Sequence, residues 1–274
     1  MKIWVNDRLF ERDEAKISVF DHGFTVGDGV FETIKTSDSQ PFALSRHLDR
    51  LRQSAEGLLL PLPDRNEISN AVSAVLAANP LAGDGRLRIT WTGGVGPAGS
   101  GRDPETKPTL VVAHVPTFAR GKTAQIITVD FPRNERSPQA GVKSTSYAEN
   151  VYALALAAAK GADEAIFGNT RGELCEGTGS NVFVVIGGEL LTPPLSSGCL
   201  GGITRALALE WCHAREIAMP LTVLLEADEI LLASTTRDLQ TVHQVNSRVM
   251  PAATERGTKA REAFKTQARL RFDP

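Results

Sequence analysis

The amino-acid sequence predicts an α+β fold organised in two domains. A chain of 274 residues is long enough for one or two domains with sizeable cores. Helical and strand patterns are mixed along it, without the regular strand–helix–strand alternation of a doubly wound sheet. Residues 116–125 are polar, contain Pro and Gly, and separate two expected strands. We therefore expect an N-terminal α+β domain over 1–116, a linker over 117–125 and a C-terminal domain over 126–274.

The first half of the chain is interpreted from its hydrophobic periodicity and its turn residues. Short strands flank the turn at Asn6 and Asp7, and an alternating pattern predicts a strand over 29–36. Apolar residues at helical spacing predict a helix over 46–58 with Ser45 as its N-cap. A second helix is expected over 65–78. Strands are then expected over 86–92 and 109–115, with the glycine-rich loop 93–101 between them.

The second half begins with an expected strand over 126–131. An alanine-rich helix follows over 148–160 and ends at Gly161. The sequence then predicts a strand over 164–169, a hairpin that turns at Gly187 and Gly188, and a helix over 203–213. Two further strands, over 229–235 and 239–245, precede a terminal helix over about 255–268.

Composition argues against several kinds of partner. The net charge is −2 and the basic residues are scattered, so we expect no nucleic-acid partner. No apolar run approaches the roughly 18 residues that a membrane span requires, so we expect no membrane association. The three cysteines, Cys175, Cys199 and Cys212, are odd in number and lack metal-ligand spacing. We therefore expect no metal site and a reduced, cytoplasmic protein.

One block, residues 141–185, carries most of the chemical information. Lys143 follows an apolar residue and precedes small hydroxyl residues, directly before the alanine-rich helix. Glu176 stands in the tight, glycine-rich sequence Glu-Gly-Thr-Gly-Ser-Asn. A desolvated lysine and an acid beside glycine-rich backbone are what pyridoxal phosphate chemistry requires. The lysine forms the Schiff base, and the acid partners the pyridine nitrogen so that the ring accepts electrons.

Four stretches together resemble one enzyme family. They are GDGVFETIK (27–35), HLDRLRQSA (47–55), the block 141–185 and LGGITR (200–205), in this order. The chain resembles the fold type IV (class IV) pyridoxal phosphate enzymes, which include branched-chain aminotransferases, D-amino acid aminotransferases, (R)-amine transaminases and aminodeoxychorismate lyases. The resemblance implies a two-domain fold of the D-amino acid aminotransferase type, pyridoxal 5′-phosphate as cofactor, and a homodimer.

The resemblance also implies roles for single residues. Lys143 would form the Schiff base and carry the proton, and Glu176 would pair with the pyridine nitrogen. Tyr147 would hydrogen-bond the cofactor's phenolic oxygen. The phosphate would be bound by Arg50 on the helix 46–58, by the helix start at Gly202, Ile203 and Thr204, and by Thr236 or, as second choice, Thr235.

Substrate recognition is less clearly marked. Lys35 and the neighbouring Phe31 lie in a segment that resembles the D-amino acid aminotransferase pattern. The Arg-x-His pair that binds the substrate carboxylate in that group is absent, because residues 97–100 read Pro-Ala-Gly-Ser. Arg86 and Arg88, two residues apart on one face of a strand, could replace it. Exposed strand charges are an equally good interpretation of the same pair.

We therefore expect a transaminase that moves an amino group between an amino acid, expected in the D configuration, and a 2-oxo acid. Aminodeoxychorismate lyase, which produces 4-aminobenzoate and pyruvate, is the alternative. A binding protein on a catalytically dead scaffold is the alternative from another class. The literal G-x-G-x-x-G at 94–99 is not followed by the helix that a dinucleotide site requires, so we reject that interpretation.

Overall fold

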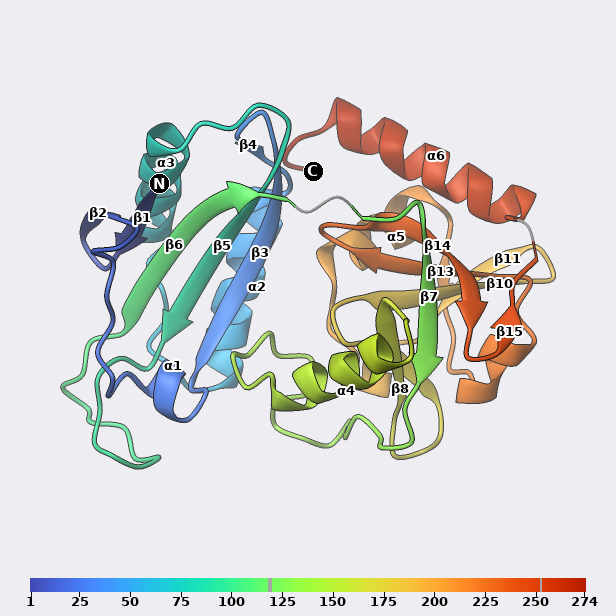
Figure 1. The fold of residues 1–274 in the computed structure, drawn as a ribbon, viewed down its shortest axis with the longest axis horizontal. Coiled ribbons are helices and arrows are strands. Elements are labelled where there is room, and N and C mark those ends of the chain that lie inside the picture. Colours follow the sequence, from blue (N-terminus) through green and yellow to red (C-terminus); the bar gives the residue numbers. More distant parts are fainter. Residues whose placement is uncertain (118–119, 252) are drawn as a thin grey trace. The chain divides into compact units, whose positions relative to one another are not determined.

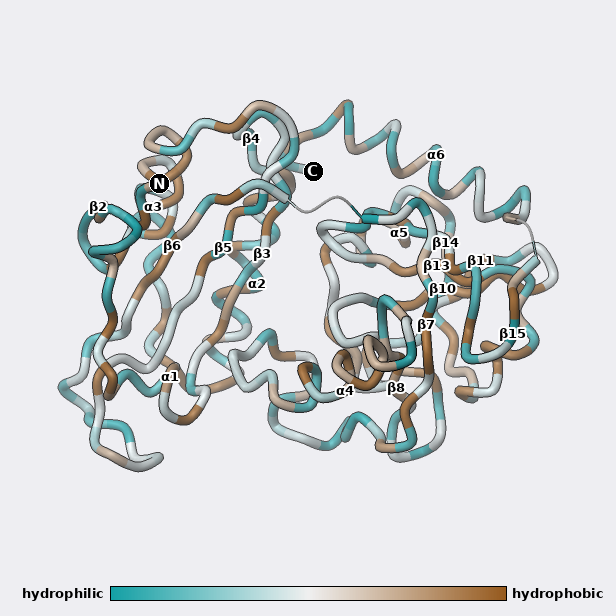
Figure 2. The backbone as a smooth tube through the Cα atoms, viewed as in Figure 1, coloured by the Kyte–Doolittle hydropathy of each residue, from teal (hydrophilic) through white to brown (hydrophobic). Residues whose placement is uncertain are grey.

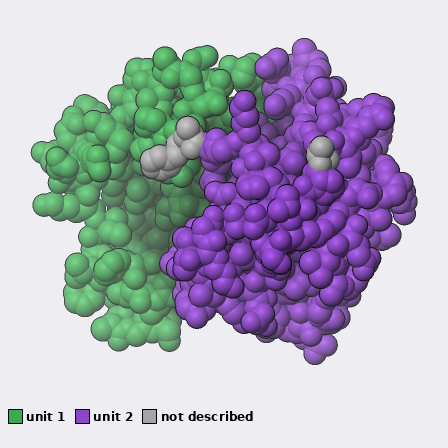
Figure 3. All heavy atoms as spheres, turned by 45° about the vertical axis from the view of Figure 1, so that its right-hand side comes forward, with its two compact units in different colours: residues 1–118, 142–147, 272–274 green, residues 119–141, 148–271 purple. Residues whose placement is uncertain are grey.

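The computed structural model describes residues 1–117, 120–251 and 253–274, arranged in two compact units (Figures 1 and 3). Unit 1 comprises Met1–Phe118, Val142–Tyr147 and Phe272–Pro274, and unit 2 comprises Ala119–Gly141 and Ala148–Arg271. Residues 118 and 119 of the expected linker lie outside the described residues. The expected domains were contiguous, whereas unit 1 also takes in two later segments, because both are hydrogen-bonded to its sheet and helices. Lys143 therefore belongs to unit 1.

Unit 1 is built on a six-stranded antiparallel sheet in the order β2-β1-β6-β5-β3-β4. The strands are β1 (Lys2–Val5), β2 (Arg8–Glu11), β3 (Gly29–Ser37), β4 (Gln40–Pro41), β5 (Asp84–Thr92) and β6 (Thr109–Pro116). β4 pairs with β3 only at its end, from Thr36 to Ser37, which leaves the start of β3 at the edge of the sheet. That edge receives the segment that carries Lys143.

Three helices complete unit 1: α1 (His22–Thr25), α2 (Leu44–Gly57) and α3 (Arg65–Ala78). α2 and α3 cover one face of the sheet (Figure 1). Their apolar side chains form a core with alternate residues of the strands, such as Val30 and Ile34 of β3. Strand alternation therefore points Glu32 toward the helices, and Phe31, Thr33 and Lys35 toward the opposite face.

The expected N-cap of α2 is wrong. The helix begins two residues earlier, at Leu44 after Ala43, and no side chain caps it from that position. Ser45 is instead hydrogen-bonded through its backbone N–H and its hydroxyl to the carboxylate of Asp273 (2.8 and 2.6 Å). A residue at the far end of the chain thus supplies the negative charge that a helix N-terminus favours.

Unit 2 contains a nine-stranded mixed sheet in the order β12-β11-β10-β13-β14-β7-β8-β9, with β15 paired to β14. The strands are β7 (Thr123–Thr128), β8 (Glu164–Gly168), β9 (Leu174–Gly177), β10 (Asn181–Ile186), β11 (Glu189–Thr192), β12 (Arg215–Glu216), β13 (Glu229–Ser234), β14 (Asp238–Val245) and β15 (Arg248–Val249). β7 runs parallel to both β14 and β8. This mixture of parallel and antiparallel pairs confirms the expected α+β class.

The helices of unit 2 are α4 (Ala148–Ala159), α5 (Ile203–Trp211) and α6 (Glu255–Leu270), with short 3₁₀ turns η1 (Leu195–Ser197) and η2 (Leu221–Leu225). α4 packs through Ala153 and Ala157 against Ile127 and Phe167 of the sheet, because alanine permits close approach. Figure 2 colours the hydrophobic stretches of the strands brown. No helix within the described residues is long and apolar enough to cross a membrane.

Candidate active site

The Lys143 segment is held as an extra strand at the open edge of β3. The Phe31 N–H donates to the Lys143 carbonyl (3.0 Å), and the Thr145 N–H donates to the Gly29 carbonyl (2.8 Å). The Lys143 N–H donates to the hydroxyl of Ser54 on α2 (3.2 Å). Two backbone–backbone hydrogen bonds and one to a side-chain hydroxyl therefore fix the position from which the Lys143 side chain extends.

The side chain of Lys143 shares an aromatic ring with Arg88. Lys143 Nζ lies 4.4 Å from the centroid of the Phe31 ring, and the guanidinium carbon of Arg88 lies 3.4 Å from the same centroid. Tyr147 meets Phe31 edge-on, with the ring centroids 5.3 Å apart. The ring's electron-rich face attracts both cations. Unit 1 thus brings together four residues that the sequence singled out.

Arg88 is a largely desolvated cation. Burial lowers the pKa of Arg88 from 12.5 to about 10, and the neighbouring Arg86 acts in the same direction. Arg88 is still charged at neutral pH. Its hydrogen bonds to Thr90 Oγ1 and Thr33 Oγ1 are long, at 3.4 Å each. A half-buried cation with weak neutral partners is suited to bind an anionic group.

Lys35 and Arg86 continue the positively charged face of the sheet. The pairing of β3 with β5 sets Thr33 opposite Arg88 and Lys35 opposite Arg86. Residues two apart on a strand lie on the same face, so Lys35, Arg86 and Arg88 share the face of Phe31. The sequence predicted the pairing of Arg86 with Arg88 on one face, but it could not predict that Lys35 lies directly opposite Arg86.

Arg50 lies on the helix-covered side of the sheet, in a buried ionic cluster with Glu32 and His47. Arg50 donates Nε and one terminal nitrogen to the two oxygens of Glu32 (2.8 and 2.7 Å). His47 Nδ1 lies 2.7 Å from Glu32 Oε2. This salt bridge uses two of the five N–H groups of the guanidinium. Glu32 and His47 were missed as site residues, although a charge at a core-facing position of β3 was a visible signal.

The charges in this cluster depend on one another. Burial raises the pKa of Glu32, but Arg50 and His47 outweigh it and bring that pKa from 4.5 to about 2. Burial lowers the pKa of His47 below 6.5, against the attraction of Glu32. Lys143 is among the charges that lower it. The cluster therefore lies within electrostatic range of Lys143, and Glu32 is ionised at neutral pH.

In unit 2, Glu176 is held from two directions. Its Oε2 accepts a hydrogen bond from the Leu200 N–H (2.9 Å). Its Oε1 lies 3.6 Å from Nε of Arg133, as an ion pair with side-chain exposures of 13% and 16%. A nearby cation favours the ionised carboxylate. Sequence reasoning missed Arg133, because nothing in its local sequence distinguishes it from a surface arginine.

The turn after Glu176 is hydrogen-bonded to the buried carboxylate of Glu164. Glu164 accepts hydrogen bonds from the Thr178 N–H (3.0 Å), the Thr178 hydroxyl and the Ser180 hydroxyl (3.0 Å). The Asn150 side chain donates to the Thr178 carbonyl (2.5 Å). These contacts fix the Gly-Thr-Gly-Ser turn, and with it the end of β9 on which Glu176 lies.

The start of α5 is an N-terminus without a side-chain cap. Gly202 is the N-cap residue and no side-chain hydrogen bond caps the helix. A Cβ at Gly202 would lie 2.0 Å from Asn181 Oδ1, so the close approach of these two segments requires glycine. Thr204 is buried in the first turn. Backbone N–H groups and a hydroxyl at such a position can bind an anion.

Thr235 and Thr236 form the tip of the turn between β13 and β14. The turn is closed by the Arg237 N–H, which donates to the Ser234 carbonyl (3.1 Å). The buried Arg237 side chain pairs with Glu164 (3.4 Å). The same acid thus supports this turn and the turn that follows Glu176.

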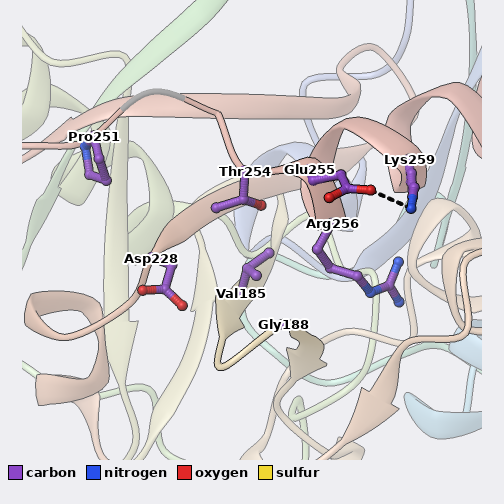
Figure 4. A pocket seen from close by; sticks show the side chains of 8 residues that line it. All are labelled: Val185, Gly188, Asp228, Pro251, Thr254, Glu255, Arg256 and Lys259. Atoms are coloured by element: carbon purple, nitrogen blue, oxygen red, sulfur yellow. Dashed lines mark ion pairs between the residues drawn. The ribbon is translucent and has the colours of Figure 1, made fainter.

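A cavity of about 560 Å³ lies elsewhere in unit 2, where α6 begins (Figure 4). Asp228, Thr254, Arg256 and Lys259 contribute to its lining. Lys259 is paired with Glu255 across it. None of the residues that line this cavity is a candidate site residue, and its charges of both signs are partnered within the helix and its neighbours.

Comparison with known proteins agrees with these features. The family model described as amino-transferase class IV matches residues 29–245. The chain belongs to the class IV aminotransferases. The expected membership is therefore confirmed, and pyridoxal phosphate is the cofactor of this family.

Its curated relatives carry different activities. A "putative branched-chain-amino-acid aminotransferase" of Methanocaldococcus jannaschii is 35% identical over 261 residues, covering 91% of this chain and 90% of the relative. An aminodeoxychorismate lyase of Bacillus subtilis is 30% identical, covering 86% and 84%. A D-alanine aminotransferase of Listeria innocua is 31% identical, covering 90% and 88%. The chain is thus a class IV aminotransferase or lyase.

Solved structures give the same family. A branched-chain aminotransferase of Thermoproteus uzoniensis with norvaline has a TM-score of 0.89 at 28% identity, covering 98% of this chain and 94% of that one. A hypothetical aminotransferase of Mycobacterium tuberculosis in its pyridoxal phosphate-bound form has a TM-score of 0.86 at 27% identity, covering 97% and 98%. These likenesses confirm the fold type IV architecture.

The chemistry of the candidate residues fits pyridoxal phosphate. Lys143 presents an amine against an aromatic ring. Glu176 is an acid paired with a cation and a backbone N–H. The uncapped start of α5 presents N–H groups suited to a phosphate. Each group by itself has the chemistry that one part of pyridoxal phosphate requires: an amine for the aldehyde, an acid for the pyridine nitrogen and N–H donors for the phosphate.

Proposed function

We propose that the protein is a transaminase that moves an amino group between an amino acid, expected to be a D-amino acid, and a 2-oxo acid. The observation that carries this proposal is the pair of cations, Lys143 and Arg88, over the one ring of Phe31. An amine that reacts at the substrate α-carbon and a cation that binds its carboxylate must lie close together. This arrangement supplies both.

Pyridoxal phosphate, when bound, supplies a ring that accepts the electron pair of the substrate's α-carbon. Lys143 is the base in our proposal. Its Nζ would take the proton from the substrate's α-carbon and return it to the carbonyl carbon of the cofactor. The amino group would then stay on the cofactor, and water would supply the keto oxygen of the released 2-oxo acid. The hydrogen bonds of the Lys143 backbone to β3 and α2 hold in place the backbone from which Nζ reaches the substrate in both transfers.

Arg88 is the proposed carboxylate site. An α-carboxylate that enters a desolvated site requires a cation, and Arg88 is half-buried and charged. Phe31 orients its guanidinium by stacking. Lys35 and Arg86, opposite each other two residues further along the strands, are the candidates for a second anionic group of the substrate.

The cofactor contacts are assigned within each unit. In unit 1 we assign Arg50 to the phosphate and Tyr147 to the phenolic oxygen. In unit 2 we assign Glu176 to the pyridine nitrogen, and Gly202, Ile203, Thr204 and Thr236 to the phosphate, with Thr235 as the alternative to Thr236. Supporting these assignments are the ion pair of Glu176, the uncapped start of α5 and the shared support of both turns by Glu164.

The lyase is the second candidate, supported by the 30% identity to the lyase of Bacillus subtilis. A lyase would release pyruvate and 4-aminobenzoate from aminodeoxychorismate and would require no 2-oxo acid acceptor. The 35% identity to the Methanocaldococcus protein supports a different amino donor for the transaminase, a branched-chain L-amino acid instead of a D-amino acid.

The test is the conversion of the bound cofactor by single substrates, followed by absorbance. D-alanine, D-glutamate, L-leucine, L-valine, an (R)-amine and aminodeoxychorismate would be compared. We expect D-amino acids to convert the cofactor fastest. Faster conversion by the L-amino acids would refute the expected configuration, and product formation from aminodeoxychorismate without a 2-oxo acid would establish the lyase.

Lys143→Ala should abolish turnover and remove the visible absorbance of the enzyme-bound cofactor, because this amine makes the covalent link. The exposed Lys160, at the end of α4, provides the control: Lys160→Ala should leave both unchanged. Circular dichroism would check that the fold is retained. Turnover by Lys143→Ala at the rate of the unaltered protein would show that another lysine does the chemistry.

A further inference from the structure

We propose that Arg133 is a positioning residue for this reaction: it keeps the Glu176 carboxylate ionised and fixed in orientation, so that the carboxylate can pair with the cofactor's pyridinium nitrogen. The inference rests on the proposed role of Glu176. It adds a residue that neither the sequence motifs nor that role requires.

Arg133 and a backbone donor contact different oxygens of the Glu176 carboxylate. Arg133 Nε lies 3.6 Å from Oε1, while Oε2 accepts from the Leu200 N–H at 2.9 Å. The two oxygens of the carboxylate are therefore engaged by different elements. A carboxylate held at both oxygens loses the freedom to rotate, which is what a directed pair with a ring nitrogen requires.

Arg133 is itself held in place. Its guanidinium stacks on the ring of Phe167 at 4.3 Å from the centroid. Its terminal nitrogens donate to Glu149 (3.0 Å) and to Asn150 (3.1 Å) in the first turn of α4. Asn150 in turn donates to the Thr178 carbonyl, two residues after Glu176. Glu176 contacts Arg133, Arg133 contacts Asn150, and Asn150 contacts the turn that follows Glu176.

The Nε–H of Arg133 is buried and makes no hydrogen bond within the described structure. Leaving a buried donor without a hydrogen-bond partner is unfavourable. The carboxylate at 3.6 Å attracts this N–H without satisfying it fully. Because the terminal nitrogens already bind α4, only Nε is directed at Glu176. The position of Nε is therefore explained by the attraction between the two charges rather than by a hydrogen bond.

The groups around Glu176 explain why its carboxylate requires the positive charge of Arg133. The thiols of Cys175 and Cys199 are buried, burial raises their pKa values, and the charge of Glu176 raises them further. Both thiols are therefore neutral. A carboxylate beside buried neutral groups is destabilised in its charged form, whereas a nearby cation favours that form. Arg133 supplies this cation.

The test follows the cofactor's ring nitrogen, using the protein reconstituted with pyridoxal phosphate labelled with ¹⁵N in the ring. In the unaltered protein the ¹⁵N resonance should be that of a protonated pyridine. Arg133→Gln, which keeps polar N–H groups but removes the charge, should shift the resonance toward the neutral pyridine. It should also weaken cofactor binding by about 10-fold or more. Arg133→Lys should restore most of the protonated signal.

Two controls separate this effect from a loss of packing. Glu149→Gln removes an exposed partner of Arg133 on α4, and Arg261→Met breaks the buried pair with Glu229 far along the sequence. Neither should move the resonance. If Glu149→Gln moves it as much as Arg133→Gln does, Arg133 acts only through α4 and the proposal fails.

The remaining outcomes are also decisive. An unchanged resonance in Arg133→Gln overturns the proposal while leaving the proposed function intact. If Arg133→Gln does not fold, Arg133→Lys decides alone: a protonated signal supports the proposal and a neutral one refutes it. A neutral nitrogen in the unaltered protein would instead contradict the proposed role of Glu176, which distinguishes the two failures.

Discussion

At the scale of single residues, the chemistry concentrates on two cations and one ring. Phe31 is 5% exposed and carries Lys143 and Arg88 over its face. A cation so placed is oriented by the ring and shielded from water, which strengthens its attraction to an anion. The substrate carboxylate and the reacting amine would both depend on this ring.

Arg88→Gln should raise the KM for amino acids and 2-oxo acids about 10- to 100-fold, the equivalent of losing one charged hydrogen-bonded pair. An amine substrate without a carboxylate should be affected much less. Steady-state kinetics on both substrate types measures the difference. Equal losses for both would mean that Arg88 is structural, and Lys35→Gln would then be compared with Arg86→Gln.

At the scale of elements, α2 is joined to β3 by a buried ionic cluster. Glu32 of β3 is fully buried and receives both Arg50 and His47 of α2. Apolar contacts alone would allow α2 to slide along the sheet, whereas three directed polar contacts fix its register. Breaking a buried pair by removing one partner is costly, because it leaves the other charge uncompensated.

Glu32→Gln should lower the free energy of unfolding by about 3–5 kcal/mol. Chemical denaturation measures it, and Glu56→Gln at an exposed position of α2 should change it by less than about 0.5 kcal/mol. A small effect of Glu32→Gln would show that Arg50 and His47 find other partners.

The same cluster predicts the direction of acid sensitivity. The pKa of Glu32 falls on folding from 4.5 to about 2, so its stabilisation is present above pH 4.5 and is lost as the pH falls toward 2. Burial lowers the pKa of His47 on folding, so protonation favours the unfolded chain and stability declines as the pH falls below 6.5. Glu32→Gln should flatten the decline between pH 4.5 and 2.

The glycine at the start of α5 can be tested with its neighbour as the control. Gly202→Ala would place a Cβ 2.0 Å from Asn181 Oδ1, whereas a Cβ at Gly201 would meet only Leu195, at 3.9 Å. Gly202→Ala should destabilise the protein by about 1–3 kcal/mol and weaken cofactor binding, since the helix start must move. Gly201→Ala should do neither. Equal cofactor affinities for the two variants would remove the start of α5 from the phosphate site.

At the scale of the whole molecule, the chain is expected to form a homodimer, as the family resemblance implies. Light scattering at micromolar concentration should give twice the chain mass of 29.4 kDa. α4 exposes Val151 and Tyr152 by 63% and 60%, which is apolar surface of the kind that a partner covers. A mass of one chain would contradict this expectation.

The sequence by itself determined the class of each long element and the family. Periodicity predicted α3 with its observed bounds, and the spacing around Lys143 and Glu176 indicated pyridoxal phosphate chemistry before any contact was known. These features are local, because hydrophobic period, turn residues and short motifs are written in adjacent positions. The minor strands β12 and β15, which depend on their neighbours, were not predicted.

Only the tertiary structure decided the partners of the candidate residues. Lys143 is anchored by Ser54, 89 residues earlier, and α2 is capped by Asp273, 228 residues after Ser45. The pairing of Glu32 with Arg50 and the approach of Arg133 to Glu176 likewise join separate elements. The physical reason is that charge neutralisation and hydrogen bonding act through space, between side chains that folding brings together and that the order of residues does not identify.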